Sequence, residues 1–183
     1  KVDKLWYTFP VGDFKFTAGA LIENYYMVET PTRYKPILKA FKLGRYGSVM
    51  GASTGQGFGV QWRQKVAPGE AAWNVAANYV ADGGEGAKSD EGLGMFGDDT
   101  DGLFLSQVGY GNRKWYLSAL YAYKHGEDGS KPAMGYSTPA ASSYDEGLHA
   151  FGVRGYWTTE ESGLIPTISA GIDIGFSDAD ADG

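Results

Sequence analysis

Five basic side chains gather in one stretch of this sequence, between Glu23 and Thr54. They are Arg33, Lys35, Lys39, Lys42 and Arg45, and only Glu23 and Glu29 oppose them in a chain whose net charge is −6. A cluster of cationic groups attracts anions. Because structureless loops longer than about 12–15 residues are uncommon in compact domains and are usually functional, residues 23–54 are predicted to form a functional insertion.

Pro36 indicates how part of this insertion is organised. Proline is favoured in the first turn of a helix, where its missing N–H costs little. A short helix that begins there places the three lysines on one side, with Ile37 and Phe41 on the other. Such a helix needs an apolar wall behind it and water in front of it. A solvated surface loop is the alternative.

The end of the chain carries a second pattern with chemical meaning. Asp178, Asp180 and Asp182 alternate and are followed by Gly183, as in the opening of a calcium-binding loop. The bidentate acid that closes such a loop would lie beyond Gly183. The pattern therefore predicts half of a calcium site, and loose binding of divalent ions by acidic loops is the alternative. No other cofactor is predicted.

Composition excludes several classes of function. The acidic balance argues against nucleic-acid binding. The chain has no cysteine and only two histidines, which leaves no thiolate chemistry and few general bases. The carboxylate pairs Glu23/Glu29 and Asp98/Asp99 have no nucleophile or base signature beside them, so no enzyme is predicted. Apolar runs are too short for a membrane helix, but a spanning strand needs only about 9–11 alternating residues.

The elements that must position these residues are about eight β-strands. Most alternate apolar and polar residues, whereas the strand 103–110 has no clear polar face. The predicted strands are 2–9, 14–22, 56–66, 73–79, 103–110, 115–123, 148–157 and 168–176. Tight turns at 10–13, 67–70, 111–114 and 158–163 alternate with long polar stretches. In an antiparallel up-and-down sheet, every tight turn then lies at one end and every long loop at the other. This layout is typical of transmembrane β-barrels.

The tryptophans favour the same interpretation. All five lie within about five residues of a tight turn. Since a strand rises roughly 3.3 Å per residue, Trp62, Trp73, Trp115 and Trp157 are expected to form an aromatic girdle at the short-turn end. Trp6 fits less well, because its face also carries Lys4 and Thr8. Tryptophans buried in a soluble sandwich are the alternative, which predicts no preference for one end.

Three segments carry a family resemblance. They read KLWYTFPVGDFKFTAG (4–19), GASTGQGFGVQWRQ (51–64) and KWYLSALYAY (114–123), and they resemble the cyanobacterial outer-membrane porins, relatives of the carbohydrate-selective porin family. The resemblance implies a trimeric barrel, surrounded by the outer-membrane lipid of a Gram-negative-type cell. It also implies passive passage of small solutes, carbohydrates among them, and inorganic ions. The chain departs from the family in lacking a periplasmic module and in having about half the strands.

The expected fold class is therefore an all-β, antiparallel up-and-down transmembrane β-barrel. Because side chains fill the interior of an eight-stranded barrel, residues 1–183 are expected to be an incomplete portion of a larger one, with 23–54 as its constriction loop. The expected pore-lining residues are Arg33, Lys35, Lys39, Lys42, Arg45, Arg63, Lys65 and Arg154. The alternative is a soluble all-β carbohydrate-binding module with aromatic platforms and a dry core between its sheets.

Overall fold

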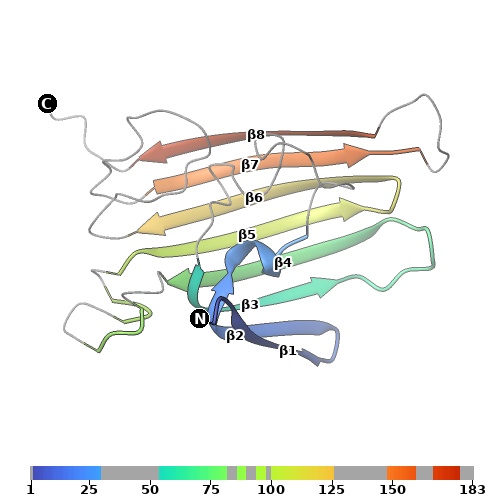
Figure 1. Cartoon of the computed structure of the whole chain (residues 1–183). Coiled ribbons are helices and arrows are strands. Elements are labelled where there is room, and N and C mark those ends of the chain that lie inside the picture. The colour runs from blue at the N-terminus through green and yellow to red at the C-terminus, as the bar shows by residue number, and fades with distance from the viewer. Residues whose placement is uncertain are drawn as a thin grey trace, which may run out of the picture.

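The computed structural model describes residues 2–29, 54–81, 86–89, 94–97, 100–125, 148–159 and 167–177. Eight antiparallel strands form one sheet in chain order, so the predicted all-β, up-and-down architecture is confirmed (Figure 1). The strands are β1 (Leu5–Val11), β2 (Phe14–Glu23), β3 (Thr54–Arg63), β4 (Ala72–Ala81), β5 (Gly102–Gly111), β6 (Trp115–His125), β7 (Leu148–Trp157) and β8 (Ile168–Ser177).

A single turn of 3-10 helix, η1 (Asn24–Met27), follows β2 and contacts β2, β3 and β4. In the described part of the chain, no helix is long and apolar enough to span a membrane.

Short and long connections alternate as the sequence predicts. The connections after β1, β3 and β5 lie together at the right-hand end of Figure 1. The first is a two-residue turn in which Gly12 has a φ of 60°. Tight hairpin turns favour glycine at such a position because it has no Cβ to clash. Because the strands are antiparallel and follow the chain order, these three connections lie at one end of the sheet.

Two predicted strand boundaries are wrong. Pro10, which was expected in the first turn, lies inside β1 and pairs with Lys15. β1 is an edge strand in the described sheet, where the missing N–H of proline need not cost a ladder hydrogen bond. The strand predicted over 56–66 ends at Arg63, because the Trp73 N–H donates to the Gln64 side chain (Oε1) at 3.2 Å instead of to the Gln64 backbone carbonyl.

The two faces of the sheet differ sharply in burial. The covered face is the one on which η1 lies, and the open face is the opposite one. The buried polar side chains of the covered face, each at most 9% exposed, include Thr17, Asn74, Asn78, Gln107, Ser118, Lys124 and Arg154. Small or aliphatic residues such as Ala76, Leu105 and Ala122 lie between them. The covered face is thus both the buried face and the polar one.

The open face is apolar from β1 to β8. Its exposed large residues, 36–70% accessible, are Tyr7, Phe9, Val11, Phe14, Phe58, Trp73, Val75, Phe104, Val108, Trp115, Leu117, Phe151, Val153, Trp157, Ile168, Ile172, Ile174 and Phe176. The three charged residues of β4 to β8 are Lys124, Arg154 and Asp173, and all three lie on the covered face. The apolar face of the sheet is therefore the accessible one.

The sheet has two free edges. Within the described residues, β1 pairs only with β2 and β8 pairs only with β7, so the sheet does not close on itself. Most residues of β8 are exposed on both faces. Both edges therefore present unpaired backbone groups that can accept a further strand.

Candidate functional site on the covered face

The insertion after β2 begins on the covered face and is held there by hydrogen bonds. The Glu29 backbone N–H donates to Gln107 Oε1 at 2.8 Å, and Gln107 Nε2 donates to the Glu29 carbonyl at 3.0 Å. Asn78 Nδ2 donates to the Asn24 carbonyl at 3.2 Å. Gln107 and Asn78 are both buried. The side chains of Gln107 and Asn78 therefore satisfy backbone groups of Glu29 and Asn24, as the neighbouring strand of a β-ladder would.

Apolar packing adds to this attachment. Val28 belongs to a buried cluster formed with Ala76, Leu103, Leu105, Leu120, Ala122 and Ala150. Met27 packs with Ile22 and Val80 in a second cluster. Residues 24–29 thus run across the middle of the covered face rather than away from it (Figure 1).

A buried polar pair crosses β4, β5 and β6 near the short-connection end. Asn74 Nδ2 donates to Tyr116 Oη at 2.8 Å, and the Tyr116 hydroxyl faces Asn74 Oδ1 at 3.1 Å. Gly109 is in register with Asn74, and a Cβ at that position would meet Tyr116 Oη at 2.0 Å. The glycine therefore makes room for the tyrosine ring to lie across β5, a cross-strand arrangement that covers the exposed backbone.

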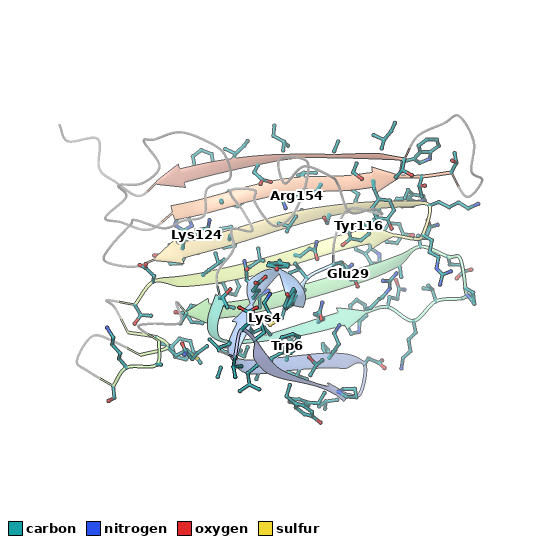
Figure 2. The ribbon with its side chains drawn as sticks, in the orientation of Figure 1. Lys4, Trp6, Glu29, Tyr116, Lys124 and Arg154 are labelled. Carbon is teal, nitrogen blue, oxygen red and sulfur yellow. The ribbon has the colours of Figure 1, made fainter. Side chains whose placement is uncertain are left out.

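Arg154 is the most deeply buried of the three predicted pore-lining residues that the structure describes. Its side chain is 2% exposed, and it forms a two-pronged ion pair with Asp173, in which Nε donates to Oδ1 at 3.2 Å and Nη2 donates to Oδ2. Its remaining nitrogen, Nη1, is buried without a hydrogen-bond partner in the described part of the chain. Lys124, on the neighbouring strand, is likewise buried, and its Nζ has no partner there either (Figure 2).

The other two predicted strand cations lie toward the short connections. Arg63 ends β3, is exposed, and has its Nη1 3.4 Å from Glu29 Oε1. It therefore faces the first part of the insertion. Lys65 lies past the end of β3 and forms an exposed ion pair with Asp13 in the neighbouring turn. The structure thus brings Arg63, but not Lys65, to the covered face.

Trp6 and Lys4 lie at the β1 edge of the covered face. Trp6 contacts the Tyr26 ring of η1, with ring centroids 5.4 Å apart. Lys4 Nζ lies 2.7 Å from both Glu23 Oε1 and Tyr26 Oη (Figure 2). The hydrogen bond to Glu23, followed by the one to Tyr26, raises the pKa of Lys4 above its ordinary value. Trp6 thus packs against the insertion, which agrees with its poor fit to the predicted girdle.

Several predicted site residues lie outside the described residues. They are Arg33, Lys35, Lys39, Lys42 and Arg45 of the insertion, the predicted helix after Pro36, the acidic pair Asp98/Asp99, and the calcium-type motif Asp178, Asp180 and Asp182. Among the residues that are described, no group of three or more histidine or acidic side chains is arranged to hold a metal.

Four tryptophans form a band on the open face at the short-connection end. Trp62, Trp73, Trp115 and Trp157 all lie there, and Trp115 pairs directly with Trp157. Tyr110 joins Trp73 and Trp115, with ring centroids 4.8 and 5.5 Å away. These residues make up the tryptophan band.

A second aromatic band lies toward the long connections, and the sequence analysis did not identify it. It contains Phe58, Tyr79, Phe96, Phe104, Tyr121, Tyr123, His149, Phe151 and Phe176, and the centroids of neighbouring rings are 4.8–6.3 Å apart. The signal was a spacing of six residues, which separates Trp73 from Tyr79, Trp115 from Tyr121, and Phe151 from Trp157. Six residues of strand span roughly 20 Å.

Comparisons with protein-family models, with curated proteins and with solved structures found no match.

Proposed function

We propose that this chain is part of an outer-membrane β-barrel porin. In this proposal it forms the wall of a passive, water-filled channel for small solutes and inorganic ions, and the insertion 23–54 is a cationic constriction. The chain acts as a conduit and not as an enzyme. The open face meets lipid and the covered face lines the channel.

The observation that carries the proposal is the inverted burial of the sheet. In a water-soluble β-sandwich, the apolar faces pack against each other and the polar faces meet water. Here the polar face is covered, and the apolar face is open across all eight strands. Lipid-facing strands have this arrangement, with an apolar belt about 25 Å tall between two aromatic girdles. The two aromatic bands, roughly 20 Å apart along the strands, agree with that spacing.

The path of the insertion supports the constriction. Residues 24–29 are fixed on the covered face by Gln107, Asn78 and the apolar cluster around Val28. The insertion therefore enters the side that the channel would occupy. An eight-stranded barrel has no room for it, because side chains fill its interior. The free edges of β1 and β8 are consistent with a wider barrel to which further strands belong.

The resemblance of residues 4–19, 51–64 and 114–123 to cyanobacterial outer-membrane porins adds the family, the trimer and the location to this proposal. The short connections then face the periplasm and the long ones the exterior. A carbohydrate-binding module is less well supported. Sugar platforms need hydrogen-bonding groups beside the rings, and on the open face of β4 to β8 these are hydroxyl and imidazole groups, with no charged or amide side chain.

Single-channel recording of the complete barrel under a salt gradient tests the function. Changing Lys35, Lys39 and Lys42 together to glutamate reverses three charges in the proposed constriction. We expect the reversal potential to move from anion-favouring toward cation-favouring, because screening is weaker where the walls exclude bulk water. The matched change at Lys88 and Lys131, in the long connections, should move it much less. A normal conductance with an unmoved reversal potential in the triple variant would exclude the constriction, and absence of channels in the wild type would exclude the porin.

A further inference from the structure

The covered face contains two buried cationic groups whose hydrogen-bonding capacity is not used. Lys124 is 9% exposed and Arg154 is 2% exposed. Lys124 Nζ and Arg154 Nη1 have no hydrogen-bond partner within the described residues. A buried charged donor without an acceptor is strongly unfavourable, so such a group indicates a missing partner.

The surroundings of Lys124 do not supply that partner. Its two cross-strand neighbours in register are Leu103 and Leu148, and Ala122 precedes it on the same face of β6. None of these side chains can accept a hydrogen bond. These strand neighbours therefore offer the Lys124 ammonium group no acceptor.

Arg154 is only partly neutralised. Asp173 accepts from Nε and Nη2, which occupies one edge of the guanidinium and leaves the donors of Nη1 unused. Lys124 and Arg154 together carry two positive charges on this part of the face, against one carboxylate. The balance favours an added anion.

The register separates the two cations along the channel direction. Lys124 pairs with Leu148, which lies six positions from Arg154 on β7, so the two levels are roughly 20 Å apart. Asp173 is in register with Gly152, between the two levels. Figure 2 shows Lys124 and Arg154 on neighbouring strands at different distances along the sheet. Ion conduction requires this kind of arrangement, with several moderately attractive positions in series rather than one tight site.

We infer that Lys124 and Arg154 are two successive binding positions for a small monovalent inorganic anion, such as chloride, on the covered face. The anion is small because both donors are nine-tenths or more buried. It is monovalent because Asp173 lies between the positions and repels a dianion more strongly. The inference rests on the proposed function for its role in transport, but anion binding is measurable without conduction.

Chloride binding to the purified full chain in a nonionic detergent provides the test. The linewidth of the ³⁵Cl NMR signal reports exchange of chloride with protein sites. Lys124→Met should weaken chloride binding at this position on the order of 10- to 100-fold, since a charge-assisted hydrogen bond is lost. The broadening of the signal should decrease accordingly. Lys88→Met, at an exposed lysine, is the matched control and should leave it unchanged. Equal broadening for the wild type and Lys124→Met would overturn the inference.

A second measurement uses the wild type alone and avoids any effect of the substitution on folding. Crystals soaked in bromide should show an anomalous peak in contact with Lys124 Nζ and another at Arg154 Nη1. Peaks only at exposed basic residues such as Lys88 would overturn the inference. If bromide binds at both positions but the protein forms no channel in planar bilayers, the proposed function fails and the binding positions stand. If channels form while bromide is absent from both positions, the inference fails alone.

Discussion

Replacing Ala77 with arginine tests whether the open face meets lipid. Ala77 lies on the open face near the middle of β4, four residues after Trp73 and two before Tyr79, and thus between the two aromatic bands. Beside it lies a groove of about 340 Å³, whose walls include Phe58 and Phe104. Because this groove leaves room for a longer side chain, the substitution should not overpack the surface. Its cost should therefore report what surrounds the face.

Lipid and water around the open face predict free-energy costs for Ala77→Arg that differ several-fold. Arginine at the midplane of a lipid-facing strand costs roughly 2–4 kcal/mol, whereas an exposed substitution in water changes stability by about 0.5 kcal/mol or less. The first range corresponds to a roughly 30- to 900-fold change in the unfolding equilibrium. Ala77→Leu extends into the same groove without a charge, so it should be neutral or stabilising in lipid.

The assay is reversible urea unfolding of the protein from phospholipid vesicles, followed by tryptophan fluorescence. Ala87→Arg, at an exposed position in the connection after β4, serves as the matched control. We expect Ala77→Arg to lose 2–4 kcal/mol relative to this control. A difference of less than about 0.5 kcal/mol would refute the reasoning, because the open face would then be in contact with water or covered by polar protein.

Two further predictions concern the covered face. Gln107→Ala removes both hydrogen bonds to the Glu29 backbone and should cost about 1–3 kcal/mol by urea unfolding. It should also speed proteolysis within residues 24–29, and an unchanged cleavage rate would show that Gln107 does not hold the insertion. Gly109→Ala places a methyl group where Tyr116 Oη now lies 2.0 Å away and should cost roughly 1–3 kcal/mol. Tyr116→Leu in that background should recover part of the loss, and if Gly109→Ala alone is as stable as wild type, the ring does not cross β5.

The parts of the fold that could be predicted from the sequence are those that depend on local patterns. Period-two alternation and glycine-containing turns are determined within a few residues, so eight strands and their short connections were expected at about the right places. Errors arose where pairing decides the boundary. Pro10 fits a turn by its type, but its pairing with Lys15 places it in β1. Alternation continues through Lys65, but the strand ends earlier because the Trp73 N–H donates to the Gln64 side chain rather than to its backbone carbonyl.

The candidate site depends on contacts that are distant in sequence. The segment that enters the covered face is held by Gln107, 78 residues away from Glu29. No local pattern identifies Gln107 as a partner for a backbone segment, since an alternating polar residue on a strand is usually solvated. The burial of Lys124 was likewise not predictable, because it depends on what lies over the face. The basic cluster of the insertion was found from composition alone, and its geometry lies outside the described residues.

Alternation defines two faces of a sheet, but it does not say which face meets the surroundings. The distribution of charge supplies that missing step. On a sheet in water, charged side chains concentrate on the exposed face, because burying them is costly. Here Lys124, Arg154 and Asp173 all lie on the covered face, and two of them leave donors unused rather than turn outward. The proposed lipid contact of the open face would account for this cost, because a charge in hydrocarbon costs more than a charge on the covered face. In the proposed porin, a hydrocarbon layer lies outside the sheet and an aqueous, anion-accessible space lies inside it.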